Sequence, residues 1–392
     1  MPWKERTVYK MREEFVRRAQ AKQKSLSALC REYGITRRTG YKWLKRAEAG
    51  EQLEDRSRRP KRIHRITAEM EQEIVRRREE YPALGAVKQH RIMHNKGYEN
   101  LPSAKTFNNV YKRNGLISEE ASQNATPCQR FERAEPNDMW QGDFLGHFAM
   151  ENGERCHPLN ILDDHSRYNL CSEPLKGETF EEVQPVLERV FKTYGKPKVF
   201  LCDNGNPWGT VQSTGFTRFE VWLMDHGILT IHGRIRHPQT QGKEERFNQT
   251  MRRELLRQKP IADWEDAAVK FEEYRRFYNE VRPHHALQLD TPSQHYQSSQ
   301  RIYCDQVSEW EYPEGTEIHT VKKTGFITWK GQGYYLSEAF GERQIGLRES
   351  RIEGCVNLFY RQFRIARLDV EKRVFTHKRA YLIDDDPRLP DT

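Results

Sequence analysis

Three acidic residues, Asp143, Asp203 and Glu245, stand where carboxylates from distant segments can converge on one site. Asp143 lies in an alternating segment on the face opposite Trp140 and Phe144, where a buried charge must be paired or bound to metal. Asp203 ends an apolar stretch, and the carboxyl ends of strands are where α/β sheets place their ligands. Glu245 opens a helical segment. The spacing is too wide for a local loop site such as an EF-hand.

Such a carboxylate set suits the breaking and making of phosphodiester bonds. Hydrolysis of the bond, and attack by a 3′ hydroxyl on another strand, both develop negative charge on the attacking and the leaving oxygen. Two metal ions about 3.5 to 4 Å apart stabilise both oxygens. Magnesium prefers oxygen ligands from few protein groups. We therefore expect two Mg²⁺ ions, held by Asp143, Asp203 and Glu245.

The elements that must position these residues follow from the hydrophobic pattern. Alternation of apolar and polar residues predicts three strands that form an antiparallel meander. Helical and strand-like segments then follow one another in alternation. The order of three strands, helix, strand, helix, strand, helix is that of a ribonuclease-H-like α/β fold. The segments, in chain order, are 138–150, 157–163, 168–175, 180–194, 198–202, 219–226, 229–232 and 243–256.

The amino-terminal part of the chain is strongly basic. Residues 1–66 contain 20 Lys or Arg and 8 Asp or Glu, a balance of +12, whereas the whole chain carries +9. Residues 25–47 divide at Gly34 into two short helices, with Thr36 as the cap of the second, as in a helix-turn-helix. A three-helix bundle with a basic face is the alternative. The residues expected to contact DNA are Arg37, Arg38, Lys42 and Lys45.

Residues 54–66 are almost without apolar side chains and predict a basic linker that lies along DNA or is a solvated tether. The linker contacts would be Arg58, Arg59, Lys61 and Arg62. Residues 67–118 predict three further helices, the third capped by Ser103, that resemble a second helix-turn-helix with candidate contacts Lys105, Asn108 and Lys112. Residues 119–137 contain two prolines among polar residues and predict another linker.

The carboxy-terminal part predicts strands again. Residues 324–370 alternate between apolar and polar types and are interrupted by Gly-containing turns, which is typical of a small antiparallel barrel. Such a barrel could hold DNA or a partner subunit. Solvated outer faces would give the same pattern of arginines.

Five motifs, WQGDF, ILDDHSRY, FLCDNG, HPQTQGKEERFNQT and FYNEVRPHHAL, resemble in order and spacing the core of bacterial insertion-sequence transposases related to retroviral integrases. The resemblance covers roughly residues 1–369. It implies a ribonuclease-H-like core with a DDE triad, Mg²⁺ or Mn²⁺, binding to terminal inverted repeats and action as an oligomer. The sequence lacks the amino-terminal zinc module of retroviral integrases, so we expect no structural zinc.

The resulting organisation is a helix-turn-helix head, a ribonuclease-H-like core and a small C-terminal SH3-like β-barrel. The expected boundaries are 1–53 for the first DNA-binding domain, 54–66 for the basic linker, 67–118 for the second helical domain, 119–137 for a linker, 138–300 for the integrase core and 318–375 for the barrel.

The resemblance assigns Asp143, Asp203 and Glu245 to the triad and leaves one ambiguity beside it. Glu244 takes a position that is often apolar in the family, and a helical wheel places it on the Phe247 stripe. Either glutamate could therefore serve when the other is substituted. The adjacent acids Asp163 and Asp164 are interpreted as structural or strand-end residues, with a metal role as the alternative.

A polar loop precedes the helix that carries Glu245. His237, Gln239, Lys243 and Arg246 in and after it could position DNA phosphates, or they form a plain loop and brace the helix.

Composition excludes several other classes of protein. The chain is 31% charged, its mean hydropathy is −0.96, and no apolar run has the length of a spanning helix. Seven scattered cysteines include no C-x-x-C pair, so they are interpreted as reduced thiols. We therefore expect a cytosolic protein, and the resemblance to bacterial transposases implies the bacterial cytosol and association with the nucleoid.

The sequence thus predicts a transposase that cleaves at transposon ends and transfers 3′ hydroxyl ends into target DNA. Its partners would be double-stranded DNA, as terminal inverted repeats and target, and further copies of the chain, as a homodimer or higher oligomer. One alternative is a transposase-derived DNA-binding regulator without catalysis. Another is a ribonuclease-H-type nuclease acting on hybrids, which would leave the helix-turn-helix head unexplained.

Overall fold

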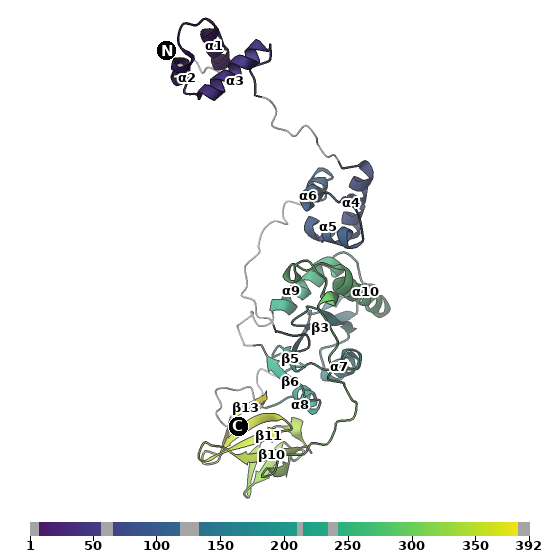
Figure 1. Cartoon of the computed structure of the whole chain (residues 1–392). Coiled ribbons are helices and arrows are strands. Elements are labelled where there is room, and N and C mark those ends of the chain that lie inside the picture. Colours follow the sequence, from purple (N-terminus) through teal and green to yellow (C-terminus); the bar gives the residue numbers. More distant parts are fainter. Residues whose placement is uncertain (1–7, 56–65, 118–132, 210–214, 234–241, 383–392) are drawn as a thin grey trace, which may run out of the picture. The chain divides into compact units, whose positions relative to one another are not determined.

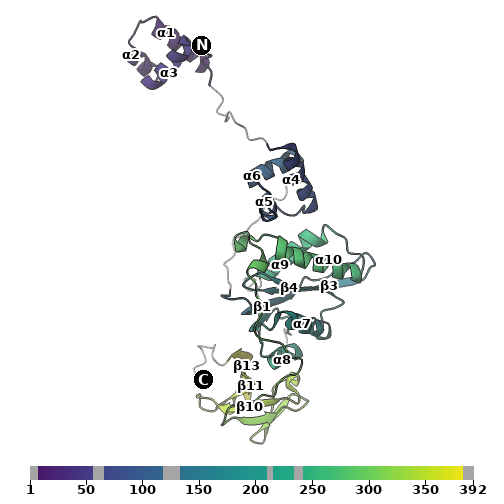
Figure 2. The same cartoon turned by 45° about the vertical axis from the view of Figure 1, so that its right-hand side comes forward.

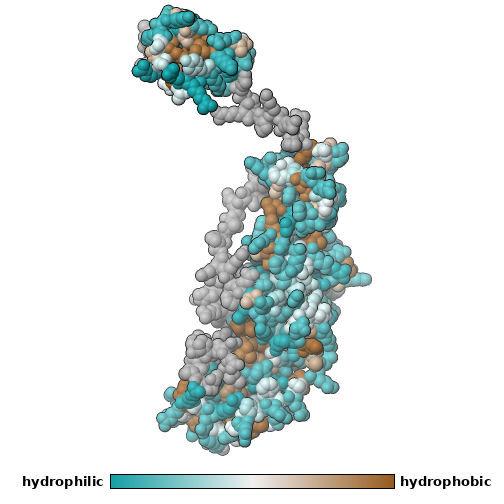
Figure 3. All heavy atoms as spheres, in the orientation of Figure 1, coloured by the Kyte–Doolittle hydropathy of each residue, from teal (hydrophilic) through white to brown (hydrophobic). Residues whose placement is uncertain are grey.

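The protein is described from a computed structural model, which covers residues 8–55, 66–117, 133–209, 215–233 and 242–382. The chain divides into two compact units, Met1–Ile66 and Thr67–Thr392, and each is described by itself. No helix among the described residues is long and apolar enough to cross a membrane. In the view of Figure 3, brown apolar areas are small and lie between hydrophilic ones.

The first unit is a helix-turn-helix built on α1 (Val8–Gln20), α2 (Leu26–Glu32) and α3 (Arg37–Glu48). Gly34 takes φ +63° in the turn, a conformation that costs glycine little. Thr36 Oγ1 accepts a hydrogen bond from Thr39 N at 3.2 Å and caps α3 as predicted. Apolar residues of all three helices form one core, which includes Phe15, Leu29 and Trp43.

A second helical group opens the other unit, with α4 (Ala68–Glu80), α5 (Ala86–Asn95) and α6 (Ala104–Arg113). Ile74, Ile92, Met93, Phe107 and Val110 are buried between these helices. The expected Ser103 cap is wrong in its chemistry. Ser103 stands at the N-cap position, but its hydroxyl pairs with the Thr106 hydroxyl at 3.2 Å instead of capping a backbone N–H.

The core is a mixed sheet in the strand order β2-β3-β1-β5-β6, with β4 on the other side of β3. β1 pairs antiparallel with β3 and parallel with β5, and β5 is parallel to β6. This is the ribonuclease-H-like arrangement that the order of segments predicted. The strands are β1 (Met139–Phe144), β2 (Phe148–Ala149), β3 (Arg155–Asp163), β4 (Asn169–Leu175), β5 (Val199–Cys202) and β6 (Leu229–His232).

Helices cover both faces of this sheet. The face containing Trp140 and Phe200 packs on α7 (Phe180–Tyr194) and α8 (Arg218–Asp225). The opposite face packs on α9 (Gly242–Met251) and α10 (Trp264–Arg276). In Figures 1 and 2, α9 and α10 lie on one side of the sheet and α7 on the other.

The helix expected over 243–256 changes type within its length. After α9 the chain continues as the π-helical segment η3 (Arg252–Leu256), and α10 likewise runs into η4 (Phe277–Val281). Glu254 of η3 accepts two hydrogen bonds from Arg282, at 2.7 and 2.8 Å, and both side chains are buried. Two short 3₁₀ turns follow, η5 (His285–Leu287) and η6 (Pro292–Gln294).

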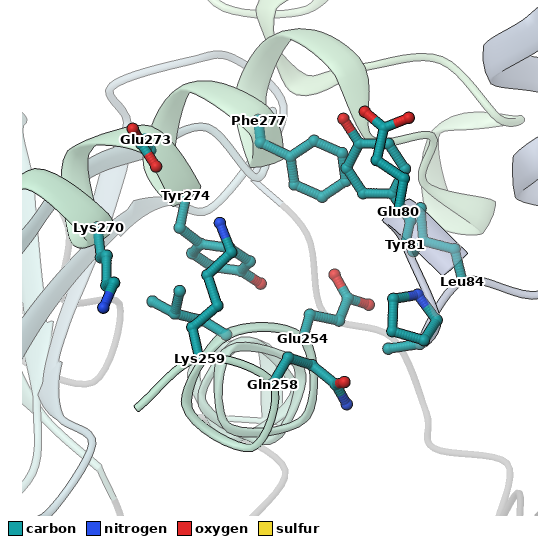
Figure 4. A pocket seen from close by; sticks show the side chains of 13 residues that line it. Glu80, Tyr81, Leu84, Glu254, Gln258, Lys259, Lys270, Glu273, Tyr274 and Phe277 are labelled. Carbon is teal, nitrogen blue, oxygen red and sulfur yellow. The ribbon is translucent and has the colours of Figure 1, made fainter. Parts of the chain in front are cut away.

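The connection between α4 and α5 packs against the segment that follows α10. The ring of Tyr81 stacks on Phe277 with centroids 4.8 Å apart, and Arg91 of α5 pairs with Asp290 at 2.9 Å. A pocket of about 230 Å³ lies beside this stack, with Tyr274 in its wall, as Figure 4 shows. The second helical group therefore packs against η4 and, across the pocket, faces residues of η3.

The C-terminal part forms an antiparallel sheet in the order β13-β12-β11-β10-β7 and a separate hairpin. The predicted barrel is not confirmed, because the described strands pair as an open sheet whose first and last members are not joined by a ladder. The strands and turn are β7 (Glu317–Thr320), β8 (Phe326–Trp329), β9 (Gln332–Tyr335), η7 (Glu338–Phe340), β10 (Gln344–Glu349), β11 (Cys355–Tyr360), β12 (Phe363–Asp369) and β13 (Val374–Leu382).

This C-terminal sheet shares a hydrophobic core with the central sheet. One cluster of buried residues includes Val199 and Leu229 of the central strands together with Ile345 and Leu358 of the C-terminal strands. Arg343 and Tyr360 both hydrogen-bond the carboxylate of Asp225, at the end of α8. The two sheets are thus packed together by apolar and polar contacts.

Candidate active site

Strand register brings the first two candidate carboxylates together. Gln141 of β1 lies opposite Leu201 of the parallel neighbour β5. Two residues further along the same direction are Asp143, still in β1, and Asp203, which directly follows β5. Both carboxylates therefore stand at the carboxyl end of adjacent parallel strands, where α/β sheets bind ligands.

Asp143 lies among other acidic groups. Burial, followed by the charge of Asp203, raises the pKa of Asp143 to about 7, and Glu178 and Glu245 add smaller increases. A hydrogen bond with the Phe144 backbone acts in the opposite direction. Three further carboxylates therefore raise the energy of the ionised form of Asp143, and a bound cation would lower it.

A chain of buried amide and hydroxyl groups supports Asp143 from behind. Asn248 of α9 donates from Nδ2 to Asp143 Oδ2 at 3.0 Å, and its Oδ1 accepts from Asn160 Nδ2 at 2.8 Å. Asn160 in turn accepts from the Ser172 hydroxyl at 2.8 Å, and Ser172 accepts from Asn169 Nδ2 at 2.8 Å. This chain fixes both the Asp143 carboxylate and the α9 side chain that contacts it.

The two glutamates at the start of α9 point to different environments. Glu244 is 1% exposed, and both of its carboxylate oxygens are buried. Burial, with a contribution from Asp143, raises the pKa of Glu244 well above its usual range. Glu245 is exposed and still acts on Asp143. The helical wheel placed Glu244 on the Phe247 stripe, and the structure buries both residues.

Glu178 is a further acidic residue at this site that the sequence did not single out. It follows β4, which runs parallel to β1 because each is antiparallel to β3. Its Oε1 lies 2.9 Å from His157 Nδ1, and its carbonyl accepts a hydrogen bond from Asn206 at 2.7 Å. The sequence feature that could have identified Glu178 is its place just beyond a predicted strand, which ends at the same sheet edge as Asp143.

Asp163 and Asp164 are fully buried and make structural hydrogen bonds. Asp163 accepts from the Ser166 hydroxyl at 2.6 Å and from the Asn137 backbone at 2.7 Å. Asp164 accepts from Gln141 at 2.5 Å and pairs with Lys243 at 2.5 Å. Lys243, expected to contact DNA, is thus paired with Asp164 at the start of α9.

The remaining expected DNA contacts fall into two groups. On the helices, Arg37, Arg38, Lys42 and Lys45 are exposed on α3, Lys105, Asn108 and Lys112 on α6, and Arg246 on α9. The others, Arg58, Arg59, Lys61, Arg62, His237 and Gln239, lie outside the described residues.

The side chains at this site are of the type that binds divalent cations. Asp143, Asp203, Glu178 and Glu245 offer only carboxylate oxygens, the ligands that Mg²⁺ and Mn²⁺ prefer. In the part of the chain that is described, no three His, Cys, Asp or Glu side chains are grouped closely enough to hold one ion.

Models of known protein families match this chain along most of the described elements. Two models of an integrase core domain match residues 133–238 and 226–292. The C-terminal domain of IS481 family transposases matches residues 316–376. A helix-turn-helix domain matches residues 11–61, and a homeodomain-like domain matches residues 39–111. The matched stretches of this chain are thus similar to an integrase core domain, followed by the C-terminal domain of IS481 family transposases.

Curated relatives come from bacterial insertion elements. The uncharacterized 39.2 kDa protein of insertion element IS476 from Xanthomonas euvesicatoria is 29% identical over 159 residues, which cover 41% of this chain and 44% of that protein. Transposase InsD for insertion element IS2D from Escherichia coli is 27% identical over 170 residues, 41% of this chain and 54% of its own length. The match thus spans about half the length of these relatives.

Solved structures with some likeness are retroviral. The integrase catalytic core of HTLV-2 in complex with magnesium has a TM-score of 0.33 and 20% identity, covering 42% of this chain and 99% of that one. The intasome of simian T-cell lymphotropic virus in complex with PP2A regulatory subunit B56 gamma has a TM-score of 0.36 and 16% identity, covering 73% and 95%.

Proposed function

We propose that this insertion-sequence integrase core is a DDE transposase that cleaves DNA at transposon ends and transfers the freed 3′ hydroxyls into target DNA. The observation that carries the proposal is the register of β1 and β5, which sets Asp143 beside Asp203 within reach of the charge of Glu245. Carboxylates crowded in this way are the donor set that phosphoryl transfer on DNA requires.

Asp143, Asp203 and Glu245 would hold two Mg²⁺ or Mn²⁺ ions, which supply charge stabilisation for the attacking and leaving oxygens. The protein residues hold these groups in place. Asn248 orients Asp143 through the 3.0 Å hydrogen bond, and the hydrogen bond from Gly205 N to Asp203 Oδ1 at 2.8 Å orients Asp203. Positioning of this kind supplies much of the rate in reactions without a covalent intermediate.

The helical parts would select the DNA. The exposed basic residues of α3 suit a major groove, and those of α6 and Arg246 suit phosphates. Because two transposon ends must be joined together, the active form would be a homodimer or a larger oligomer on DNA, with the C-terminal sheet holding DNA or a partner subunit. The boundaries 1–53, 67–118, 138–300 and 318–375 are the proposed domains.

Strand transfer is the test of the catalytic proposal. A labelled duplex carrying the element end, taken from the DNA that flanks the gene, is incubated with plasmid and Mg²⁺ and with the parent, Asp203→Asn or Glu245→Gln. We expect joining by the parent and binding without joining by the variants. Equal binding with no joining by any of them would favour a DNA-binding regulator, and cleavage of an RNA–DNA hybrid alone would favour a ribonuclease.

DNA binding by α3 has a test of its own. Lys42→Ala should weaken binding to the element end and reduce the slope of log affinity against log salt by about one, since one phosphate contact is lost. Lys192→Ala is the matched control, because Lys192 is an exposed lysine of α7 paired with Asp305. Equal slopes in both variants would remove α3 from the proposed DNA surface.

A further inference from the structure

The last residue of β6 is bonded to the backbone of Asp203. His232 is in register with Cys202, the last residue of the parallel strand β5. Its Nδ1 lies 2.7 Å from the carbonyl oxygen of Asp203. Because a carbonyl oxygen can only accept, Nδ1 is the donor in this bond. The imidazole thus binds the backbone at the point where the candidate catalytic carboxylate leaves the sheet.

The other nitrogen of the same ring is bonded to helix α8. His232 Nε2 lies 3.0 Å from Glu220 Oε1, and both side chains are about 15% exposed. The second oxygen of Glu220 accepts from the Thr217 backbone N–H at 2.7 Å and completes the capping box of α8. One carboxylate therefore joins the start of α8 to His232, and through it to Asp203.

The surroundings hold the imidazole in this orientation. Cys202 Sγ lies 3.7 Å from Nδ1. A Cβ placed on Gly209 would come within 3.1 Å of His232 Cε1, so the glycine leaves just enough room for the ring. Beside it, Asn204 Nδ2 donates to Gly233 O at 2.9 Å, and Gly233 N donates to Cys202 O at 2.9 Å. The turn after β5 is therefore tied to the end of β6 by several bonds.

We propose that His232, held by Glu220, is a positioning residue for Asp203. It fixes the backbone of Asp203 so that the carboxylate stays beside Asp143 when a divalent cation binds. The inference rests on the proposed function, because it takes Asp203 to be a metal ligand. Polar groups that orient metal ligands typically change metal affinity by about 10- to 100-fold when they are removed.

Two substitutions separate the bond to Asp203 from the bond to Glu220. In His232→Asn the amide nitrogen can take the place of Nδ1 and keep the bond to the Asp203 carbonyl. In His232→Gln the amide can take the place of Nε2 and keep the bond to Glu220 alone. A role in packing alone would make the two variants equivalent, whereas the proposed role makes His232→Gln the more damaging.

The readout is binding of Mn²⁺ to the full chain, followed by the electron paramagnetic resonance of free Mn²⁺, with thermal unfolding measured on each variant. We expect His232→Gln to weaken Mn²⁺ binding by about 10-fold or more and His232→Asn by a few-fold at most. Strand transfer should fall in the same order. His226→Gln is the matched control, because His226 is a buried histidine at the other end of α8 and is expected to change stability without changing Mn²⁺ affinity.

Asp203→Asn distinguishes the failure of this inference from the failure of the proposed function. If Asp203→Asn binds Mn²⁺ as the parent does, Asp203 is not a metal ligand and both proposals are overturned. If Asp203→Asn weakens binding but His232→Gln and His232→Asn match each other, only the positioning role of His232 is overturned.

Discussion

The two sheet carboxylates and the two helix glutamates are held by different means. Asp143 and Asp203 are set side by side by the pairing of β1 and β5, and each accepts a hydrogen bond that orients it. Glu244 and Glu245 are consecutive on α9, so only one of them can face the sheet interior, and that one is Glu244. Backbone ladders define the first pair, whereas helix rotation and side-chain packing define the second.

Because the two pairs are held differently, a substitution in the sheet pair and one in the helix pair should disturb different properties. Strand pairing is made by the backbone, so exchanging the side chain of Asp143 or Asp203 should remove a carboxylate and leave the sheet in place. On α9 the same exchange affects either the buried carboxylate of Glu244 or the exposed carboxylate of Glu245. We therefore expect both substitutions of the sheet pair to lower catalysis, whereas on the helix the effect should depend on which glutamate is changed.

The largest effect is expected from the sheet pair. Asp143→Asn and Asp203→Asn should each lower strand transfer by at least about 10³-fold, on the scale of removing groups that stabilise charge in the transition state. The unfolding midpoint of either variant should not fall. A single-turnover assay of end joining and a thermal melt measure both quantities. A variant that keeps more than a tenth of the parent rate would contradict the assignment of its carboxylate.

On the helix, the two glutamates should respond in opposite ways. We expect Glu245→Gln to lower strand transfer by about 10²- to 10³-fold with an unchanged melting temperature, because Glu245 is exposed and acts on Asp143. Glu244→Gln should stay within a few-fold of the parent rate, because its side chain lies in the apolar layer with Phe247. The reverse result would make Glu244 the third catalytic acid.

Asn248 connects the two regions, so its removal should have an intermediate effect. Asn248→Ala loses the bonds to Asp143 and Asn160 and should lower strand transfer by about 10- to 100-fold. Thr250→Ala is the control on the same helix, because the Thr250 hydroxyl bonds the Arg246 carbonyl instead of the site. Equal rates for the two variants would show that the link between helix and sheet does not matter for catalysis.

The smallest predicted effect is on stability. The pKa of Asp143 is about 7 in the folded chain and 3.8 in its ordinary state, so the folded chain holds this proton more tightly. The stability that the protonated Asp143 carboxyl adds to the folded chain is therefore complete below about pH 4 and is lost as the pH rises through 7. In chelator, the parent should lose about 1 to 3 kcal/mol between pH 4 and 8, and Asp143→Asn should lose less.

Denaturant titrations at several pH values measure this loss. Added Mg²⁺ should restore stability to the parent at pH 8 and should do less for Asp143→Asn, because a bound cation favours the ionised carboxylate. If the stability of the parent rises steadily from pH 4 to 8 in chelator, this result would contradict the raised pKa of Asp143.

Much of this arrangement was predictable, because local patterns and motif order carry it. The alternation around Asp143, the apolar stretch before Asp203 and the burial of Glu244 beside Phe247 all follow from period-two and period-3.6 patterns. The turn at Gly34 and the Thr36 cap are equally local. These features depend on neighbours within a few residues.

What was not predictable depends on long-range pairing. The ion pair of Lys243 with Asp164 joins the start of α9 to a distant strand end, and Glu178 reaches the site because β4 runs parallel to β1. Alternation in the C-terminal part predicts strands but not whether the sheet closes, so the expected barrel became an open sheet. The Ser103 cap was also not predictable, because the Ser103 hydroxyl bonds the Thr106 hydroxyl and not a backbone N–H.

The hydrophobic cluster shared by the central and C-terminal sheets also affects how the chain is made. Val199 and Leu229 are covered by residues such as Leu358, which a ribosome adds more than a hundred residues later. During synthesis that face of the central sheet stays exposed to solvent until the C-terminal strands emerge from the ribosome. A chain released early would carry Asp143 and Asp203 on a sheet with an uncovered apolar face, and such surfaces promote aggregation. Burial of this face of the central sheet thus requires the C-terminal strands.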